Sequence, residues 1–315
     1  MRFPLLPLLL FSSCTPRSSP SPAVDAGATA LSASVQPLPE AVPAPPTLPL
    51  AQQVELKTRE ARDTFPAVRI RVLRDAFVLA VVGSDALLER AAAFVERTLT
   101  AYYNGRFQDP PAYAVLLYFF QRFDEYDQYV GTHFHVPGSK YYGLFGKYSH
   151  VAAVDGSHVD AYLPTLAHEL VHPILDGELG IKRPEWASEC VGSLFEAPTF
   201  PAPGEIRGAP NWRFRQVLHP ALHPADGGAP AEVSLPALFQ MDDATFLDEH
   251  AQDLNYAVAR SFCLYMDTKG KLWPWIAAWR GHVTEDPTGE AAFTAVTGET
   301  PAQADAAWRK WVDRL

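Results

Sequence analysis

Residues 167–173 read Ala-His-Glu-Leu-Val-His-Pro and form the most informative stretch of the chain. His168 and His172 are four positions apart, so on an α-helix both imidazoles project from the same face, one turn from each other. The flanking positions are apolar: Leu163, Leu166, Leu170, Val171, Ile174 and Leu175. This pattern predicts a buried helix that carries two histidines and a glutamate.

Buried imidazole and carboxylate groups cost free energy unless a bonding partner compensates for their lost hydration. A zinc ion is such a partner, because it binds imidazole nitrogens at about 2.0–2.1 Å and accepts two ligands from one helix at this spacing. Glu169 follows His168, where its carboxylate can act as a general base toward a water molecule. Two core histidines bonded to backbone groups are the alternative. We expect Pro173 to kink the helix just beyond the motif.

A catalytic zinc ion takes three protein ligands, so the chain must provide one more. Pro184 fits the first position of a second helix. Three carboxylates lie on the polar side of that predicted helix: Glu185, Glu189 and Glu196. Spacing alone leaves the choice among the three open.

The sequence His-Glu-x-x-His at 168–172, followed by Trp-x-x-Glu at 186–189, resembles the gluzincin metallopeptidases. The likeness is to their exported, peptidase-MA-like group and covers about residues 65–315, strongly at the motif and loosely elsewhere. In that family the glutamate of the second segment is the third zinc ligand, which corresponds to Glu189. The family usually has glycine at the next position, where this chain has Cys190.

This resemblance implies a zinc-dependent peptidase with one zinc ion per chain and a peptide or protein substrate. His168, His172 and Glu189 would bind the metal, and Glu169 would be the catalytic base. In related enzymes a tyrosine of the C-terminal lobe donates a hydrogen bond to the oxyanion, and Tyr256 is the matching candidate in this chain. The alternative is a buried tyrosine whose hydroxyl bonds locally.

Two other functions remain open at this point. One is a zinc-bound but non-hydrolytic scaffold on the cell surface, which would not need a base at Glu169. The other is a zinc-free binding lipoprotein, for which three ligand-type residues in this arrangement would be coincidental. The sequence leaves open the substrate sequence, the choice between internal and terminal cleavage, and the oligomeric state.

The distribution of apolar residues predicts an α+β fold, and the resemblance to the gluzincins implies that it is of the zincin type. Helical periodicity covers residues 86–103, and residues 131–146 are rich in glycine and aromatic residues and are predicted to form a loop. Runs of β-branched and apolar residues predict four strands, at residues 69–74, 77–82, 113–118 and 147–154. If the last of these borders the cleft, an extended substrate would pair with it by strand addition.

From Tyr162 onward the chain is predicted to be almost entirely helix and loop. We therefore expect a small mixed sheet with the active-site helix in an N-terminal lobe, residues 51–176. A mostly helical C-terminal lobe, residues 177–315, would carry the third ligand. His133, His135, His219 and His223 are interpreted as loop histidines rather than metal ligands.

The N-terminus has the pattern of an export signal. Residues 1–13 combine a positive start with the short apolar stretch Phe3–Phe11, whereas a bilayer span needs about 20 residues. The end of this segment resembles a bacterial lipoprotein signal, which implies lipidation of Cys14; ordinary cleavage near Ser13 is the alternative. Residues 14–50 are rich in proline, alanine and serine and are interpreted as a tether. The expected location is the bacterial cell envelope.

Composition narrows the range of partners. The formal net charge is -10 and no run of lysine or arginine is present, so nucleic acid and anionic membrane surfaces are poor electrostatic partners. Membrane attachment is therefore expected through the lipid anchor only. The 3 cysteines are too few for a disulfide scaffold. Cys190 and Cys263 could form a disulfide or remain two buried thiols.

Overall fold

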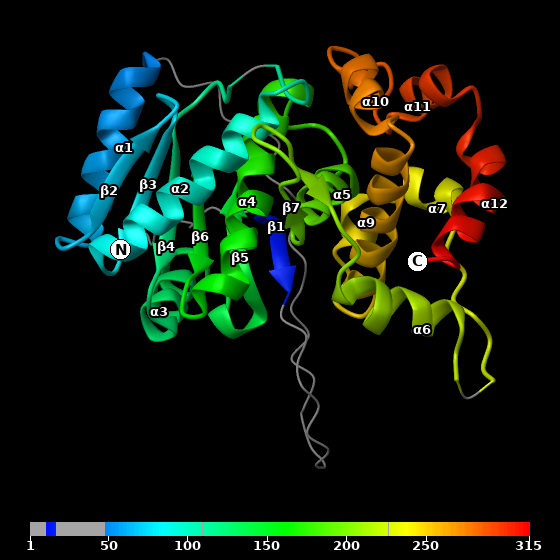
Figure 1. Cartoon of the computed structure of the whole chain (residues 1–315), viewed down its shortest axis with the longest axis horizontal. Coiled ribbons are helices and arrows are strands. Elements are labelled where there is room, and N and C mark those ends of the chain that lie inside the picture. Colours follow the sequence, from blue (N-terminus) through cyan, green and yellow to red (C-terminus); the bar gives the residue numbers. More distant parts are fainter. Residues whose placement is uncertain (1–10, 17–47, 109, 226) are drawn as a thin grey trace, which may run out of the picture.

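The computed structural model describes residues 11–16 and 48–315, except residues 109 and 226. The described chain is a mixed α+β structure with a six-stranded sheet in its N-terminal half and helices in its C-terminal half (Figure 1). The strands are β1 (Phe11–Pro16), β2 (Arg69–Leu73), β3 (Phe77–Val82), β4 (Val115–Phe120), β5 (Tyr141–Gly146) and β6 (Val151–Asp155). Their order in the sheet is β1-β5-β6-β4-β3-β2. The pairs β3–β4 and β4–β6 are parallel, and the other pairs are antiparallel.

Helices cover both faces of this sheet. Helices α1 (Leu50–Thr64) and α3 (Phe123–His133) pack on one face, together with alternate strand residues such as Val78 and Leu116. Helices α2 (Asp85–Tyr102) and α4 (Val159–Leu179) pack on the other face. Strands β3, β4 and β6 are therefore buried on both sides, which explains why their sequences are continuously apolar.

The C-terminal half contains the remaining helices. They are α5 (Glu185–Leu194), α6 (His219–Leu222), α7 (Leu235–Phe239), α8 (Asp243–Phe246), α9 (Gln252–Thr268), α10 (Leu272–Trp279), α11 (Glu290–Thr297) and α12 (Pro301–Val312). A π-helical turn, η2 (Phe214–Leu218), precedes α6, and the two-residue strands β7 (Pro198–Thr199) and β8 (Arg207–Gly208) form a small hairpin. Four buried tryptophans contribute to the core of this half: Trp186, Trp275, Trp279 and Trp308.

The prediction of a loop over residues 131–146 is wrong at both ends, because residues 131–133 are the last residues of α3 and residues 141–146 form strand β5. Glycine normally weakens a strand, and this hid β5 in the sequence. The structure gives Gly143 a reason, because a Cβ atom there would lie 2.5 Å from Cγ2 of Thr165 and 2.6 Å from Oε1 of Glu169 on α4. The missing side chain lets the strand lie directly against the motif helix.

The strand predicted over 147–154 begins only at Val151. It is an interior strand of the sheet and not an edge strand. Residues 147–150 form the turn between the antiparallel strands β5 and β6, and His150 adopts a positive φ of 53° there. Strand β6 lies between β4 and β5, and the edge strand beyond β5 is β1, which contacts α5. The motif helix α4 continues through Pro173 to Leu179 and passes beyond the expected lobe boundary at residue 176.

Residues 11–16 span the expected junction between signal peptide and tether, and they form strand β1 in the structure. Their backbone pairs with β5 in the antiparallel sense, with Ser12 opposite Phe145 and Cys14 opposite Leu144. The rest of the expected signal peptide and most of the tether lie outside the described residues. Among the helices of the described residues, none combines the length and the hydropathy needed to cross a membrane.

Candidate metal centre

Helix α4 brings His168, Glu169 and His172 together in the interior of the protein, and each of the three side chains is fully buried. Their ligand-type atoms lie within 4.8 Å of one another, and they are the one group of this kind found in the described part of the chain. The two imidazole rings are 5.0 Å apart between centroids, as i, i+4 spacing predicts. This buried cluster could bind a metal ion.

Helix α5 adds a fourth residue to the cluster, since it packs against α4 and carries Glu189. Oε2 of Glu189 lies 3.3 Å from Nε2 of His168, and its Oε1 lies 3.9 Å from Nε2 of His172. A tetrahedral zinc ion with bonds of about 2.0–2.1 Å holds its ligand atoms roughly 3.3 Å apart. The spacing of these three residues therefore fits a zinc ion.

The hydrogen bonding of these atoms supports the same fit. In the described part of the chain, neither Nε2 atom and neither Glu189 oxygen has a hydrogen-bond partner of normal geometry. Buried polar atoms in native proteins are almost always satisfied, so four such atoms that face one another call for a shared partner. A divalent cation provides one, because imidazole nitrogens and a carboxylate are the donor set that zinc prefers.

Glu169 also lies within ligand distance of the histidines, so geometry alone allows it as a metal ligand. Its Oε1 borders Gly143 on β5, whereas Glu189 lies close to both Nε2 atoms. The two other carboxylates that the sequence left open have different surroundings. The backbone amide of Glu185 donates to Asp243 at the start of α5, and Glu196 is paired with Arg213 beyond the end of α5.

The electrostatics of the two histidines differ. Burial by itself lowers the pKa of His168, but the carboxylates of Glu189, Glu169 and Glu196 overcome this and raise it to about 9. The pKa of His172 is lowered well below its usual value by burial, with a further contribution from the charge of His168. Burial raises the pKa of Glu189 above its ordinary value.

His172 has supporting residues that sequence analysis did not identify. Its Nδ1 lies 2.8 Å from Oγ of Ser188, which also accepts a hydrogen bond of 3.0 Å from Nη2 of Arg183. The same guanidinium donates to Asp176 at 2.5 Å, and the hydroxyl of Tyr113 donates to the other oxygen of that carboxylate. The only signal in the sequence was the position of Ser188, directly before Glu189.

Tyr256 is fully buried on α9, close to the end of the helix that faces α8. Its ring stacks on Phe246 at 5.0 Å between centroids, and the guanidinium carbon of Arg213 lies 5.0 Å above it. Tyr265, on the same helix, packs against Trp311 at 5.5 Å. Tyr256 therefore contacts Arg213, the partner of Glu196. Tyr265 has no part in this contact and packs against Trp311 instead.

The sequence allowed either a disulfide between Cys190 and Cys263 or two buried thiols, and the structure has the disulfide. Cys190 and Cys263 are bonded, with a Cα–Cα distance of 5.5 Å and 73 positions between them in the sequence. The bond joins α5, at the residue after Glu189, to α9. The helix that carries the fourth residue of the cluster is thus covalently attached to the C-terminal core.

Comparison with known proteins adds no further assignment, because no family model matches the chain and no curated protein matches its sequence. The functional argument therefore depends on the geometry of the site.

Proposed function

We propose that the protein is a zinc metallopeptidase of the gluzincin type, with a zincin-like fold and one zinc ion per chain. The observation that carries this proposal is the convergence of His168, His172 and Glu189 on one buried point, with Glu169 beside them. Two of these residues are on α4 and Glu189 is on α5, so the site depends on the packing of both helices.

His168, His172 and Glu189 would hold the zinc ion, and Glu169 would transfer protons rather than bind the metal. When bound, zinc supplies Lewis acidity, which lowers the pKa of a coordinated water toward about 7. Glu169 would take a proton from the attacking water and deliver it to the leaving amine. Its position against Gly143 keeps it next to β5, on the side of the site where a peptide could approach.

Tyr256 would donate a hydrogen bond to the oxyanion that forms during hydrolysis. This assignment is supported by its burial and by its contact with Arg213, which belongs to the same polar network as His168. A local structural role for its hydroxyl remains the competing explanation.

An extended peptide would bind by pairing with β5 rather than with residues 147–154. Strand β1 supports this assignment, because its residues 11–16 already pair with β5 in the antiparallel sense, as an extended peptide would. Substrate would take the position of β1, so this segment has to leave. Signal cleavage after residue 13 would remove half of it.

Export to an oxidising compartment is supported by the disulfide between Cys190 and Cys263, since such bonds are rare in the cytosol. Attachment through a lipid on Cys14 remains part of the proposal, together with a location in the bacterial cell envelope. A non-hydrolytic, zinc-bound surface scaffold is the alternative function.

The substitution Glu169→Gln separates a peptidase from a scaffold. Because Glu169 is proposed as base and not as ligand, the variant should retain about one zinc per chain and lose hydrolysis of an unfolded protein substrate. Glu185→Gln, another buried carboxylate, is the matched control and should retain both properties. Equal activity of Glu169→Gln and the parent, or a fully zinc-loaded parent that cleaves no member of a broad peptide library, would favour the scaffold.

A further inference from the structure

His168 lies between two carboxylates that face opposite sides of its ring. Nε2 faces Glu189, and Nδ1 lies 3.7 Å from Oε1 of Glu196. Nδ1 has no hydrogen-bond partner of normal length among the described residues. Glu196 follows the end of α5 and its side chain is only 6% exposed. A buried carboxylate that faces a metal-ligand histidine from behind needs an explanation.

Arg213 holds Glu196 in place. Its Nε lies 3.0 Å and 3.3 Å from the two carboxylate oxygens, and its Nη2 donates to Oε1 at 3.0 Å. Asn211 donates a further hydrogen bond of 2.8 Å to Oε2. The positive charge of buried Arg213 compensates for the cost of burying this carboxylate. Both oxygens are engaged, so Glu196 is poorly placed to become a metal ligand itself.

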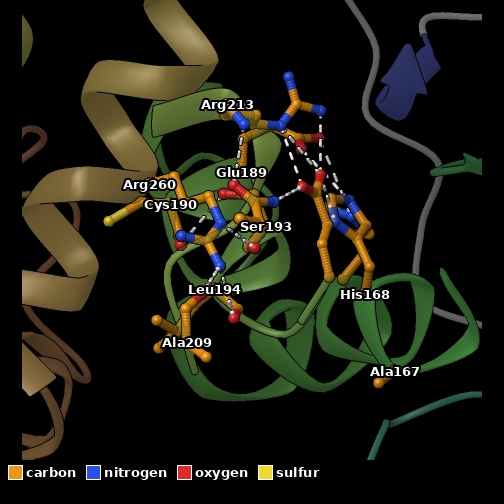
Figure 2. A network of polar contacts seen from close by, with 12 residues as sticks. Ala167, His168, Glu189, Cys190, Ser193, Leu194, Ala209, Arg213 and Arg260 are labelled. Atoms are coloured by element: carbon orange, nitrogen blue, oxygen red, sulfur yellow. Dashed lines mark hydrogen bonds and ion pairs between the residues drawn. The ribbon is translucent and has the colours of Figure 1, made fainter. Parts of the chain in front are cut away.

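Arg260 on α9 fixes the backbone that leads to Glu196. Its Nε donates to the carbonyl oxygen of Ser193 at 2.8 Å, and its Nη2 donates to that of Ala209 at 2.5 Å (Figure 2). Ser193 is in the last turn of α5, where carbonyl groups lack partners within the helix. Two buried arginines therefore set the position of one carboxylate behind His168.

We propose that Glu196, held by Arg213, is a positioning residue that accepts a hydrogen bond from the Nδ1–H group of His168 and so directs Nε2 toward the metal. A neutral imidazole carries one N–H group, so a proton held at Nδ1 leaves the lone pair of Nε2 for coordination. A carboxylate in this place also makes the ring a stronger donor. The inference rests on the proposed zinc site, and it requires the 3.7 Å separation to shorten to hydrogen-bond length, about 2.8 Å, when zinc is bound.

The test is zinc affinity, measured on the purified protein by competition with a chelator. Glu196→Gln keeps the shape of the side chain and an oxygen that accepts from Arg213, and we expect it to weaken zinc binding about tenfold. Glu196→Ala should weaken it about 100-fold, because outer partners of metal ligands typically contribute 10–100-fold. Glu185→Gln, at the start of α5, should leave zinc affinity unchanged.

A second measurement distinguishes positioning from a general loss of structure. In zinc-loaded protein with ¹⁵N-labelled histidine, the Nδ1–H resonance of His168 should be protected from solvent exchange, and Glu196→Gln should abolish this protection while the other resonances of the folded protein are retained. Because the variant leaves buried Arg213 without its charge partner, we expect it also to lower the melting temperature of the metal-free chain. If the parent binds zinc and Glu196→Gln matches it in affinity and in this resonance, the positioning role is wrong while the zinc site stands. If the parent binds no zinc, the proposed function itself is wrong.

Discussion

The two histidines of the candidate metal centre are one helical turn apart, yet they have different neighbours behind them. Nδ1 of His168 faces the carboxylate of Glu196, which is paired with Arg213. Nδ1 of His172 lies at hydrogen-bond distance from the neutral hydroxyl of Ser188, whose second neighbour is Arg183. On each side an arginine lies behind the group that faces Nδ1, but only one side places a negative charge against the ring.

This difference has an electrostatic consequence. Carboxylates raise the pKa of His168 to about 9, whereas burial lowers the pKa of His172, and Arg183 adds to that effect. Both arrangements suit the same tautomer, since Ser188 and Glu196 can each accept a hydrogen bond from an Nδ1–H group, which leaves the lone pair of Nε2 for coordination. We therefore interpret His168 as the proposed ligand whose metal binding is strengthened by a neighbouring negative charge. His172 is the proposed ligand whose ring is oriented by a neutral hydrogen-bond partner.

The largest expected effect is the loss of the metal when a ligand is removed. His168→Ala or Glu189→Ala should reduce the zinc content from about one ion per chain to nearly none, as measured by elemental analysis of the purified protein. Glu185→Ala should retain zinc. Loss of zinc in Glu185→Ala or Glu196→Ala together with a harmless Glu189→Ala would refute the choice of Glu189.

The arginine behind His172 should also stabilise the metal-free chain. Arg183 is buried and pairs with buried Asp176, so Arg183→Met leaves an unpaired carboxylate and should lower the free energy of unfolding by about 3–5 kcal/mol. Urea denaturation of the chelator-treated protein measures this. The double variant Arg183→Met, Asp176→Leu removes both charges and should recover most of the loss; no recovery would show that the ion pair is not the cause.

His150 extends the comparison to a histidine outside the cluster, because it stacks on Tyr113, whose hydroxyl donates to Asp176. Burial lowers the pKa of His150 from 6.5 to about 4. The unfolded chain therefore binds the proton more readily, so this contribution to stability is complete above pH 6.5 and is lost as the pH falls toward 4. The loss should reach up to about 3 kcal/mol.

Urea denaturation at pH 7 and pH 4.5 checks this prediction. His150→Asn suits the positive φ at this position and should show a smaller decrease in stability between the two pH values than the parent. Equal decreases in the parent and the variant would show that His150 is not responsible.

The smallest expected effect concerns the hydroxyl behind His172. Ser188→Ala should weaken zinc binding about tenfold, at the lower end of the range for outer partners of metal ligands. The measurement is the same chelator competition that tests Glu196. A larger loss in Ser188→Ala than in Glu196→Ala would contradict the interpretation of His168 as the ligand strengthened by a neighbouring negative charge.

The features that could be predicted from the sequence are those set by local spacing. The motif helix followed from the i, i+4 histidines and their apolar neighbours, and strand β3 matches its predicted range, 77–82. Strand β5 was missed, because the reason for Gly143 is the close approach of α4, which no local pattern contains. Local spacing also could not predict contacts between residues that tertiary packing brings together.

The supporting residues of the site belong to that second class. Glu196 and Arg213 are 17 positions apart, and the pairing depends on how the chain returns after the β7–β8 hairpin. Spacing likewise could not select Glu189, because the angle between α4 and α5 decides which carboxylate of α5 reaches the histidines. The family resemblance supplied that choice in advance of the structure.

The disulfide next to Glu189 has a thermodynamic consequence for the metal. By tying α5 to α9, the bond between Cys190 and Cys263 restricts the helix that zinc binding must also hold in place, so oxidation reduces the entropy that binding has to remove. Such coupling is reciprocal: whatever factor oxidation adds to zinc affinity, bound zinc returns by making the disulfide harder to reduce. Each tenfold in affinity corresponds to about 30 mV in the reduction potential. A chain oxidised only after export would thus bind zinc most tightly outside the cytosol, and the bound ion would in turn protect the bond.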